Sequence, residues 1–195
     1  NDLVSKYVPR LKGFATTNHP GATGDGLVLA EKAGAQLIDM TEIQTHPTVV
    51  PKVGEMITEA VRGNGAILIN KDGKRFTNEL LTRDVVSQNV LKQKDGVAYL
   101  IYDQSIYDSN KLSRGYFEQG YSVKASDVKD LAAKINVPLA TLEATMKAYQ
   151  EAYKLGKDET FGRPEMLIPL DKAPYYAALV TPGIHHTMGG VTITP

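Results

Sequence analysis

The sequence predicts an α+β fold. Segments with helical spacing and segments with strand-like composition follow one another without the regular β-α-β alternation of a parallel sheet. Residues 96–103, GVAYLIYD, form a strongly apolar run of the length typical of a buried strand. Asp72-Gly73, a dipeptide favoured in tight turns, separates two further strand-like runs. The middle of the chain therefore combines a sheet with separate helices.

The first part of the chain is predicted to mix short helices with loops. Residues 1–8 favour a short helix that stops at Pro9, and the glycine-rich residues 15–26 favour a loop. Helical spacing follows over residues 27–36. The side chains expected to face inward from this helix are Leu27, Leu29, Ala30 and Ala33.

Extended segments are then predicted over residues 36–40 and 42–50, where Pro47 removes one ladder donor. A short helix or turn over residues 55–63 precedes a hairpin, whose strands over 66–70 and 75–78 flank the Asp72-Gly73 turn. The patterns place further helices over 82–93, 126–135 and 136–156.

Local signals mark the ends of the last two helices. Ser126-Asp127 is a cap sequence, Pro138 suits a first turn, and Gly156 suits a terminator. One face of the second helix combines Leu139, Leu142, Thr145, Met146, Tyr149 and Tyr153. The acidic pair Asp158 and Glu159 follows in a predicted loop and is expected to be solvated, and the chain from residue 163 onward is proline-rich and extended.

Composition excludes several classes of function. The 195 residues contain 22 Lys+Arg and 22 Asp+Glu, and this balance argues against a nucleic-acid partner, which would favour a basic excess. The absence of cysteine excludes disulfides, thiolate metal sites and cysteine nucleophiles. No apolar run approaches the length of a membrane span.

The segment 21–26, GATGDG, is a candidate binding loop just ahead of a predicted helix. A helix N-terminus presents backbone N–H groups that bind phosphate or carboxylate, and the Asp25 carboxylate suits ribose hydroxyls. The same residues also suit a plain tight turn with Asp25 as the helix cap. The Lys-[Ser/Thr] ending of a phosphate-binding P-loop is absent.

Several charged residues have both a structural and a functional interpretation. His46 stands at a strand end, where a lone histidine is more often structural than a ligand. Glu59 and Arg62 are three residues apart on one helical face, a spacing typical of a surface ion pair. Arg75 and Arg83 could each cap a carbonyl, pair with a carboxylate such as that of Glu79, or bind an anionic substrate. An arginine pKa above about 12 argues against an acid role on chemistry alone.

His185 and His186 lie next to each other in a predicted extended segment. Neighbouring strand residues point to opposite sides, so one imidazole could face a substrate while the other faces a cofactor. A metal site is disfavoured, because no carboxylate or third histidine stands at ligand spacing. We therefore predict no metal.

Five ordered segments together resemble the flavoprotein subunits of the fumarate reductase and succinate dehydrogenase superfamily, in particular the soluble fumarate reductases of the flavocytochrome c type. These segments are NHPGATGDGLVLAEKAGAQL, IQTHPT, TEAVRGNGAILINKDGKRFTNEL, TRD and TPGIHHTMGGV. The resemblance implies an FAD-binding domain interrupted by a mobile clamp (capping) domain, with the active site between them. Residues 1–41 would be part of the FAD-binding domain, 42–170 the clamp, and 171–195 the return into the FAD-binding domain.

The resemblance also implies a reaction and a set of roles. FAD would deliver hydride from its N5 atom to fumarate, and an arginine would deliver a proton, which yields succinate. The implied proton donor is Arg83, with Glu59 and Arg62 as the delivery path behind it. The implied substrate-binding residues are His46, Thr58, Glu59 and His185. The implied cofactor contacts are Thr23, Gly24, Asp25 and His186.

Some parts of the family pattern are missing from this sequence. The G-x-G-x-x-G pyrophosphate fingerprint, a late glycine-rich segment with a second arginine, and a haem-attaching C-x-x-C-H are all absent. We therefore expect a fragment that is inactive alone, haem only on a domain outside this chain, and a haem domain or cytochrome as electron donor. A periplasmic location is implied by the resemblance alone.

Two alternatives stay open. One is an enzyme for another acid, such as a urocanate or methacrylate reductase or an aspartate oxidase. The other belongs to a different class, a clamp-like module that binds a partner or a small anion without catalysis.

Overall fold

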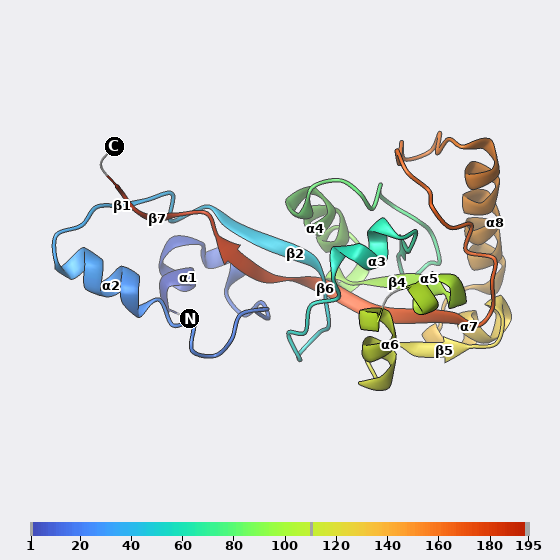
Figure 1. Ribbon diagram of the computed structural model, residues 1–195, viewed down its shortest axis with the longest axis horizontal. Coiled ribbons are helices and arrows are strands. Elements are labelled where there is room, and N and C mark those ends of the chain that lie inside the picture. The colour runs from blue at the N-terminus through green and yellow to red at the C-terminus, as the bar shows by residue number, and fades with distance from the viewer. Residues whose placement is uncertain (1, 110, 194–195) are drawn as a thin grey trace.

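The computed structural model describes residues 2–109 and 111–193 and shows an elongated molecule with a small lobe and a large lobe (Figure 1). Both ends of the described chain lie at the small lobe, and a long two-stranded ribbon joins this lobe to the large one. The small lobe contains α1 (Asp2–Tyr7), the 3-10 helix η1 (Pro9–Leu11), α2 (Asp25–Lys32), β1 (Leu37–Ile38) and β7 (Gly190–Val191).

The other elements form the ribbon and the large lobe. In chain order they are β2 (Ile43–Val49), α3 (Glu59–Gly63), β3 (Ile67–Ile69), α4 (Arg83–Leu91), the 3-10 helix η2 (Lys94–Gly96), β4 (Ala98–Asp103), α5 (Gln104–Ser109), α6 (Lys111–Glu118), β5 (Val123–Ala125), α7 (Val128–Ile135), α8 (Leu139–Leu155) and β6 (Tyr175–Thr187). None of the helices in the described ranges combines the length and the apolar character needed to cross a membrane.

Strand β6 runs through both lobes and pairs with three other strands. Its last residues pair with β2 in the ribbon, and its first residues pair with β4 and β5 in the large lobe. The resulting sheet is antiparallel, with the order β2-β6-β4-β3 and with β5 also on β6. The register between β2 and β6 shifts between His46 and Val49, where Pro47 cannot donate to the ladder.

The structure confirms most of the predicted elements of the large lobe. Strand β4 is buried along nearly its whole length, as its apolar run predicts. Helix α7 begins after Asp127, whose carboxylate accepts a 2.8 Å hydrogen bond from the Asp130 N–H. Helix α8 follows Pro138 and ends at Gly156 in the left-handed conformation. Leu142, Met146 and Tyr149 form its buried face.

The predicted hairpin around Asp72-Gly73 is only half correct. The turn forms, with Gly73 at φ +79° and the Asn70 N–H bonded to the Lys74 carbonyl. Residues 75–78 form no strand, and only Ile69 and Arg75 make a bridge. Strand β3 pairs with β4 instead.

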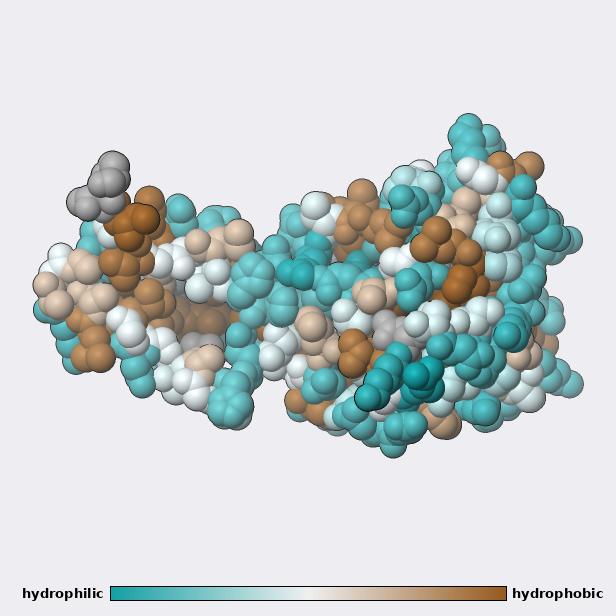
Figure 2. All heavy atoms as spheres, in the orientation of Figure 1, coloured by the Kyte–Doolittle hydropathy of each residue, from teal (hydrophilic) through white to brown (hydrophobic). Residues whose placement is uncertain are grey.

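A second correction concerns the helix in the small lobe. Helix α2 has no buried residue, and Leu29, expected to face inward, is 65% exposed. Figure 2 shows hydrophobic residues gathered on the surface of this lobe, and the exposed apolar side chains there include Leu29, Ile38, Met188, Val191 and Ile193. The helical spacing of residues 27–36 therefore marks an apolar face that the described chain leaves uncovered.

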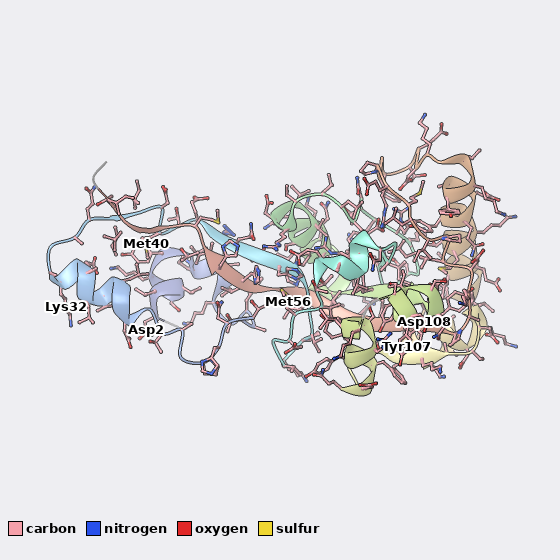
Figure 3. All side chains as sticks on the ribbon, viewed as in Figure 1. Asp2, Lys32, Met40, Met56, Tyr107 and Asp108 are labelled. Carbon is pink, nitrogen blue, oxygen red and sulfur yellow. The ribbon has the colours of Figure 1, made fainter. Side chains whose placement is uncertain are left out.

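The main core lies in the large lobe, between the sheet and its helices. It includes three tyrosine rings in a stack, with Tyr176 between Tyr102 and Tyr107 at centroid distances of 5.1 and 4.7 Å. Figure 3 shows the side chain of Tyr107 in this lobe and that of Met56 near the base of the ribbon. A separate small core of Val4, Val8, Leu11 and Ile184 holds α1 and η1 against the ribbon.

A buried charge cluster explains why residues 75–78 leave the hairpin. The Arg75 guanidinium donates to both carboxylate oxygens of Glu79 at 2.9 and 2.8 Å, and to Asp158 at 2.9 Å. Arg163 donates to the same Glu79 carboxylate at 3.0 Å. The prediction that Asp158 is solvated is therefore wrong, because its carboxylate is drawn inside by Arg75, while Glu159 is exposed as expected.

Candidate active site

The candidate residues from four elements meet at the junction of the two lobes. His46 lies on β2 and faces Gly183 across the ribbon, while His185 and His186 lie near the end of β6. Glu59 is the first residue of α3, and Arg83 is the first residue of α4. The antiparallel pairing of β2 with β6 brings together histidines that are far apart in the sequence.

Arg83 and Glu59 form the central ion pair of this site. The Arg83 Nε atom donates to Glu59 Oε1 at 2.5 Å, and Arg83 Nη2 contacts the same oxygen. Arg83 Nη1 donates to the Gln44 side-chain oxygen at 2.7 Å. Both charged side chains are about one third exposed, at 30% for Arg83 and 38% for Glu59, so the pair is open to the solvent between the lobes.

Gln44 is a site residue that the sequence prediction missed. It stands two residues before His46 on the same strand, and strand residues two apart share a face. The alternation of β2 therefore held the signal that could have found it.

His46 is fully buried and has one unused polar atom. Its Nδ1 accepts a hydrogen bond from the Thr48 N–H at 3.3 Å, so the ring proton resides on Nε2. That Nε2 has no hydrogen-bond partner among the described residues and lies 3.5 Å from Glu59 Oε2. Burial, together with the charge of Arg62, lowers the pKa of His46 to about 3, so the ring is neutral.

His185 faces His46 across the site. Their ring centroids are 5.4 Å apart in an edge-on arrangement. The His185 Nδ1 atom is 2.8 Å from the Thr17 hydroxyl, and the Asn18 amide donates to the His185 carbonyl at 2.8 Å. Burial and the nearby Arg83 lower the pKa of His185. Thr17 and Asn18 were missed by the sequence prediction, which treated this segment only as a loop.

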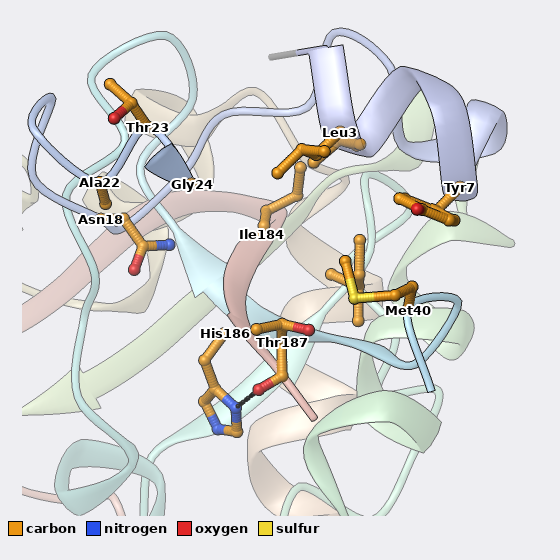
Figure 4. A pocket seen from close by; sticks show the side chains of 12 residues that line it. Leu3, Tyr7, Asn18, Ala22, Thr23, Gly24, Met40, Ile184, His186 and Thr187 are labelled. Atoms are coloured by element: carbon orange, nitrogen blue, oxygen red, sulfur yellow. Dashed lines mark hydrogen bonds between the residues drawn. The ribbon is translucent and has the colours of Figure 1, made fainter. Parts of the chain in front are cut away.

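His186 lies close to His185, with ring centroids 5.1 Å apart, so the prediction that the two side chains point to opposite sides of the strand is wrong. The register is irregular here, because Gln44 pairs with His186 and Thr45 with Ile184, which leaves His185 as an extra residue in β6. His186 lines a cavity of about 310 Å³ in the small lobe. Figure 4 shows Asn18, Thr23 and Gly24 around this cavity, together with apolar side chains. Asp25 is exposed at the start of α2 and does not line the cavity.

This cavity fits one part of a large planar cofactor. It combines apolar walls from Leu3, Tyr7, Met40 and Ile184 with polar groups of Asn18, Thr23 and His186. Gly24 packs closely against the Leu3 side chain, from which an added Cβ would lie only 2.5 Å away. The mixed lining suits an aromatic ring system with polar edges.

Arg62 does not join the other charged residues. It is buried, and its Nη1 donates to the Glu79 carbonyl at 2.7 Å, while its Nε has no partner among the described residues. Burial lowers the pKa of Arg62 to about 10. The surface ion pair expected between Arg62 and Glu59 is therefore wrong, because α3 turns this side chain toward the buried charge cluster.

Thr58 precedes α3 and is held through its backbone. Its N–H donates to the Tyr116 hydroxyl at 3.1 Å, and its own side chain makes no cap bond to the helix. Tyr116 comes from α6, a region without any sequence motif. No signal in the sequence could have identified it.

Comparisons with known proteins agree with this architecture. Residues 1–195 match a family described as FAD binding domain. A fumarate reductase (cytochrome) from Shewanella frigidimarina is 48% identical over 193 residues, which cover 99% of this chain and 34% of that protein. A urocanate reductase from Eggerthella lenta is 35% identical, and the alignment covers 98% of this chain and 33% of that protein.

A solved structure of the open conformation of a flavocytochrome c3 fumarate reductase matches with a TM-score of 0.85 and 41% identity. The match covers 99% of this chain and 34% of that chain. The chain thus spans about a third of the length of each of these relatives. These findings confirm the predicted resemblance, the mixed fold of helices and sheet, and FAD as the cofactor of the family.

Proposed function

The chain belongs to the FAD binding domain family, and on that premise we propose that it is part of a flavoenzyme that reduces fumarate to succinate. The observation that supports this most is that Glu59 contacts both Arg83 and His46. The 48% identity to a fumarate reductase supports the same substrate class.

The proposed domain division follows the two lobes except at the start of β6, where Tyr175–Val180 pair with β4 in the large lobe. Residues 1–41 and 171–195 are assigned to the FAD-binding domain and 42–170 to a mobile clamp. Strands β2 and β6 are then the two connections between them, since β2 begins at Ile43 and β6 ends at Thr187. A site that lies at such a junction is closed or opened by movement of the clamp.

Substrate binding is assigned to groups that donate hydrogen bonds. The neutral His46 has its Nε2–H free to donate to a carboxylate, and His185 stands opposite. The Thr58 hydroxyl, which makes no cap bond, is the third donor. Two imidazoles and a hydroxyl around one space suit the two carboxylates of a small dicarboxylate.

Arg83 is the proposed proton donor, and Glu59 the group that returns its proton. When bound, FAD supplies the hydride for one alkene carbon. Arg83 gives a proton to the other carbon, and Glu59, already bonded to the guanidinium, takes up a proton from the solvent and passes it to Arg83. Arg62 is proposed as the next group of this path from the resemblance alone, because its guanidinium donates to the Glu79 carbonyl and makes no bond to Glu59 among the described residues.

Thr23, Gly24, Asp25 and His186 are the proposed FAD contacts. Thr23, Gly24 and His186 line the cavity of the small lobe, and Asp25 begins the adjoining helix. The electron donor, a haem domain or cytochrome, and a periplasmic location are proposed from the flavocytochrome relatives. Haem would be on a domain outside this chain.

The test is turnover by the complete FAD-loaded protein that contains this chain. With reduced methyl viologen as electron donor, we expect rapid oxidation of the dye on addition of fumarate and slow oxidation with urocanate or methacrylate. Faster turnover of urocanate would favour the urocanate reductase, which the 35% identical relative supports. Binding of fumarate without dye oxidation would favour the non-catalytic module.

A further inference from the structure

One peptide group next to the site is held by side chains at both of its polar atoms. The carbonyl of Ile57 accepts a 2.7 Å hydrogen bond from the Thr48 hydroxyl on β2. The N–H of Thr58, on the other side of the same peptide bond, donates to the Tyr116 hydroxyl on α6 at 3.1 Å. Side chains from β2 and α6, which are remote from each other in the sequence, therefore hydrogen-bond to the two polar atoms of one peptide group.

The Thr48–Ile57 bond is buried, and the Thr58–Tyr116 bond is partly buried. Thr48 and Ile57 have no exposed surface, and Tyr116 is 5% exposed. A buried polar group without a partner is costly, and this applies most strongly to the Ile57 carbonyl. The two side chains therefore hold the peptide plane in one orientation.

The orientation of this plane decides where the next residues point. Thr58 is the last residue before α3, and Glu59 is the first residue within it. A rotation of the Ile57–Thr58 peptide would move the Thr58 hydroxyl and the Glu59 carboxylate together. The Thr48 N–H also bonds His46 Nδ1, so one residue contacts both halves of the site.

We propose that Thr48 and Tyr116 are positioning residues that hold the Ile57–Thr58 peptide and thereby place Thr58 and Glu59 against His46 and Arg83. The substrate side of this inference rests on the proposed function. Neither Thr48 nor Tyr116 touches the reacting atoms in this assignment. Tyr116 acts through the peptide, and Thr48 acts both through the peptide and through its contacts to His46 Nδ1.

The kinetic test uses Thr48→Val and Tyr116→Phe in the complete FAD-loaded enzyme. Each variant keeps its shape but loses the hydroxyl, and we expect kcat for fumarate to fall about tenfold, because Glu59 is released from its position. Thr48→Ser restores the hydroxyl and should return kcat to within about twofold of the parent. Unchanged kcat in both variants would overturn the proposal.

Two matched controls separate positioning from general stability. Tyr102→Phe removes a buried 2.7 Å bond to Ser122, and Thr145→Val removes a 2.7 Å bond to the Gly73 carbonyl, both far from the site in the large lobe. We expect these variants to lower the Tm without changing kcat. A purely structural role for Thr48 and Tyr116 would make all four variants behave alike.

A second readout does not depend on turnover. Hydrogen exchange of the Thr58 amide in the complete protein should be faster in Tyr116→Phe than in the parent and unchanged in Tyr102→Phe. If the parent does not reduce fumarate, the proposed function fails, while this exchange rate still decides whether Tyr116 holds the peptide. Faster exchange with unchanged kcat in an active enzyme would contradict the positioning role.

Discussion

The Nε2 atom of His46 lies 3.5 Å from the Oε2 atom of Glu59. The two side chains come from a strand and a helix, and the other oxygen of the same carboxylate is held by Arg83. Glu59 therefore links a buried neutral imidazole with a guanidinium that is about one third exposed. This link puts a hydrogen-bond donor for a carboxylate next to the proposed source of a proton, and it leads to the first prediction.

Replacement of Arg83 by lysine should nearly abolish fumarate reduction. Lysine keeps the positive charge but loses the fork that contacts Glu59 and Gln44 together, so the proton is misplaced. We expect kcat to fall by a factor of about 10² to 10⁴. The measurement is steady-state turnover in the complete FAD-loaded enzyme.

Arg114→Lys is the matched control for Arg83→Lys, because the Arg114 guanidinium donates to the exposed Asp108 carbonyl and to no group of the site among the described residues. It should retain full activity. Activity close to that of the parent in Arg83→Lys would rule out the assigned role of Arg83.

The buried neutral state of His46 predicts an acid-sensitive stability. Its pKa of about 3 in the folded protein is below the ordinary histidine value of about 6.5, so the unfolded state binds a proton first as the pH falls. The stability is fully present above about pH 6.5 and is lost progressively toward about pH 3. Between about pH 6.5 and about pH 5, His46 should lower the free energy of unfolding by about 2 kcal/mol.

Urea unfolding at several pH values measures this effect. His46→Gln should show a shallower loss of stability over the same pH range, whereas His19→Gln, at an exposed position, should follow the parent. Parallel curves for His46→Gln and the parent would mean that His46 is not buried in its neutral form.

The glycine pair after His186 should tolerate alanine at only one position. A Cβ added at Gly189 would lie 2.3 Å from the Asp39 carbonyl oxygen, which is backbone and cannot rotate away, while a Cβ at Gly190 meets nothing within 4 Å. We expect Gly189→Ala to destabilise the protein by about 1–3 kcal/mol and Gly190→Ala by less than about 1 kcal/mol. Chemical denaturation of both variants checks the difference, and equal losses would refute the close approach of the two segments.

The buried charge cluster should matter for stability rather than for turnover. Glu79→Gln leaves the guanidinium groups of Arg75 and Arg163 without their common carboxylate, and breaking such a buried pair costs about 3–5 kcal/mol. Glu143→Gln, at an exposed position on α8, is the control with the same chemical change. Unfolding midpoints in urea provide the measurement. A midpoint for Glu79→Gln equal to that of the control would show that the Glu79 carboxylate does not stabilise the folded protein.

Local patterns predicted the elements that depend on neighbours in the sequence. The apolar run of β4, the cap at Asp127 and the terminator Gly156 are all confirmed, because each acts within one strand or one helical turn. The predicted strand over residues 75–78 is wrong because Arg75 finds its carboxylates in Glu79 and in the distant Asp158. No local pattern contains that second partner.

The candidate site shows the same division. The family motifs point to Arg83, Glu59 and His46, whereas strand alternation fails for His185 and His186, whose rings lie 5.1 Å apart at an irregularity of β6. Gln44 could have been found from strand alternation, whereas Thr17 and Tyr116 reach the site only through folding, from segments far along the chain. The orientation of Arg62 could not be predicted from helix spacing either, because its burial against the Glu79 carbonyl decides it.

The sequence by itself determined the family, the mixed fold of helices and sheet, and the identity of the polar residues from which the site is built. Only the tertiary structure decided which of them meet: that Glu59 stands between His46 and Arg83, that Arg62 turns away, and that Thr48 and Tyr116 hold one peptide from two sides. The reason is physical. Periodicity and caps are set by short-range sterics and hydrogen bonds, while contacts between remote segments arise only when the core is buried and its polar groups must find partners.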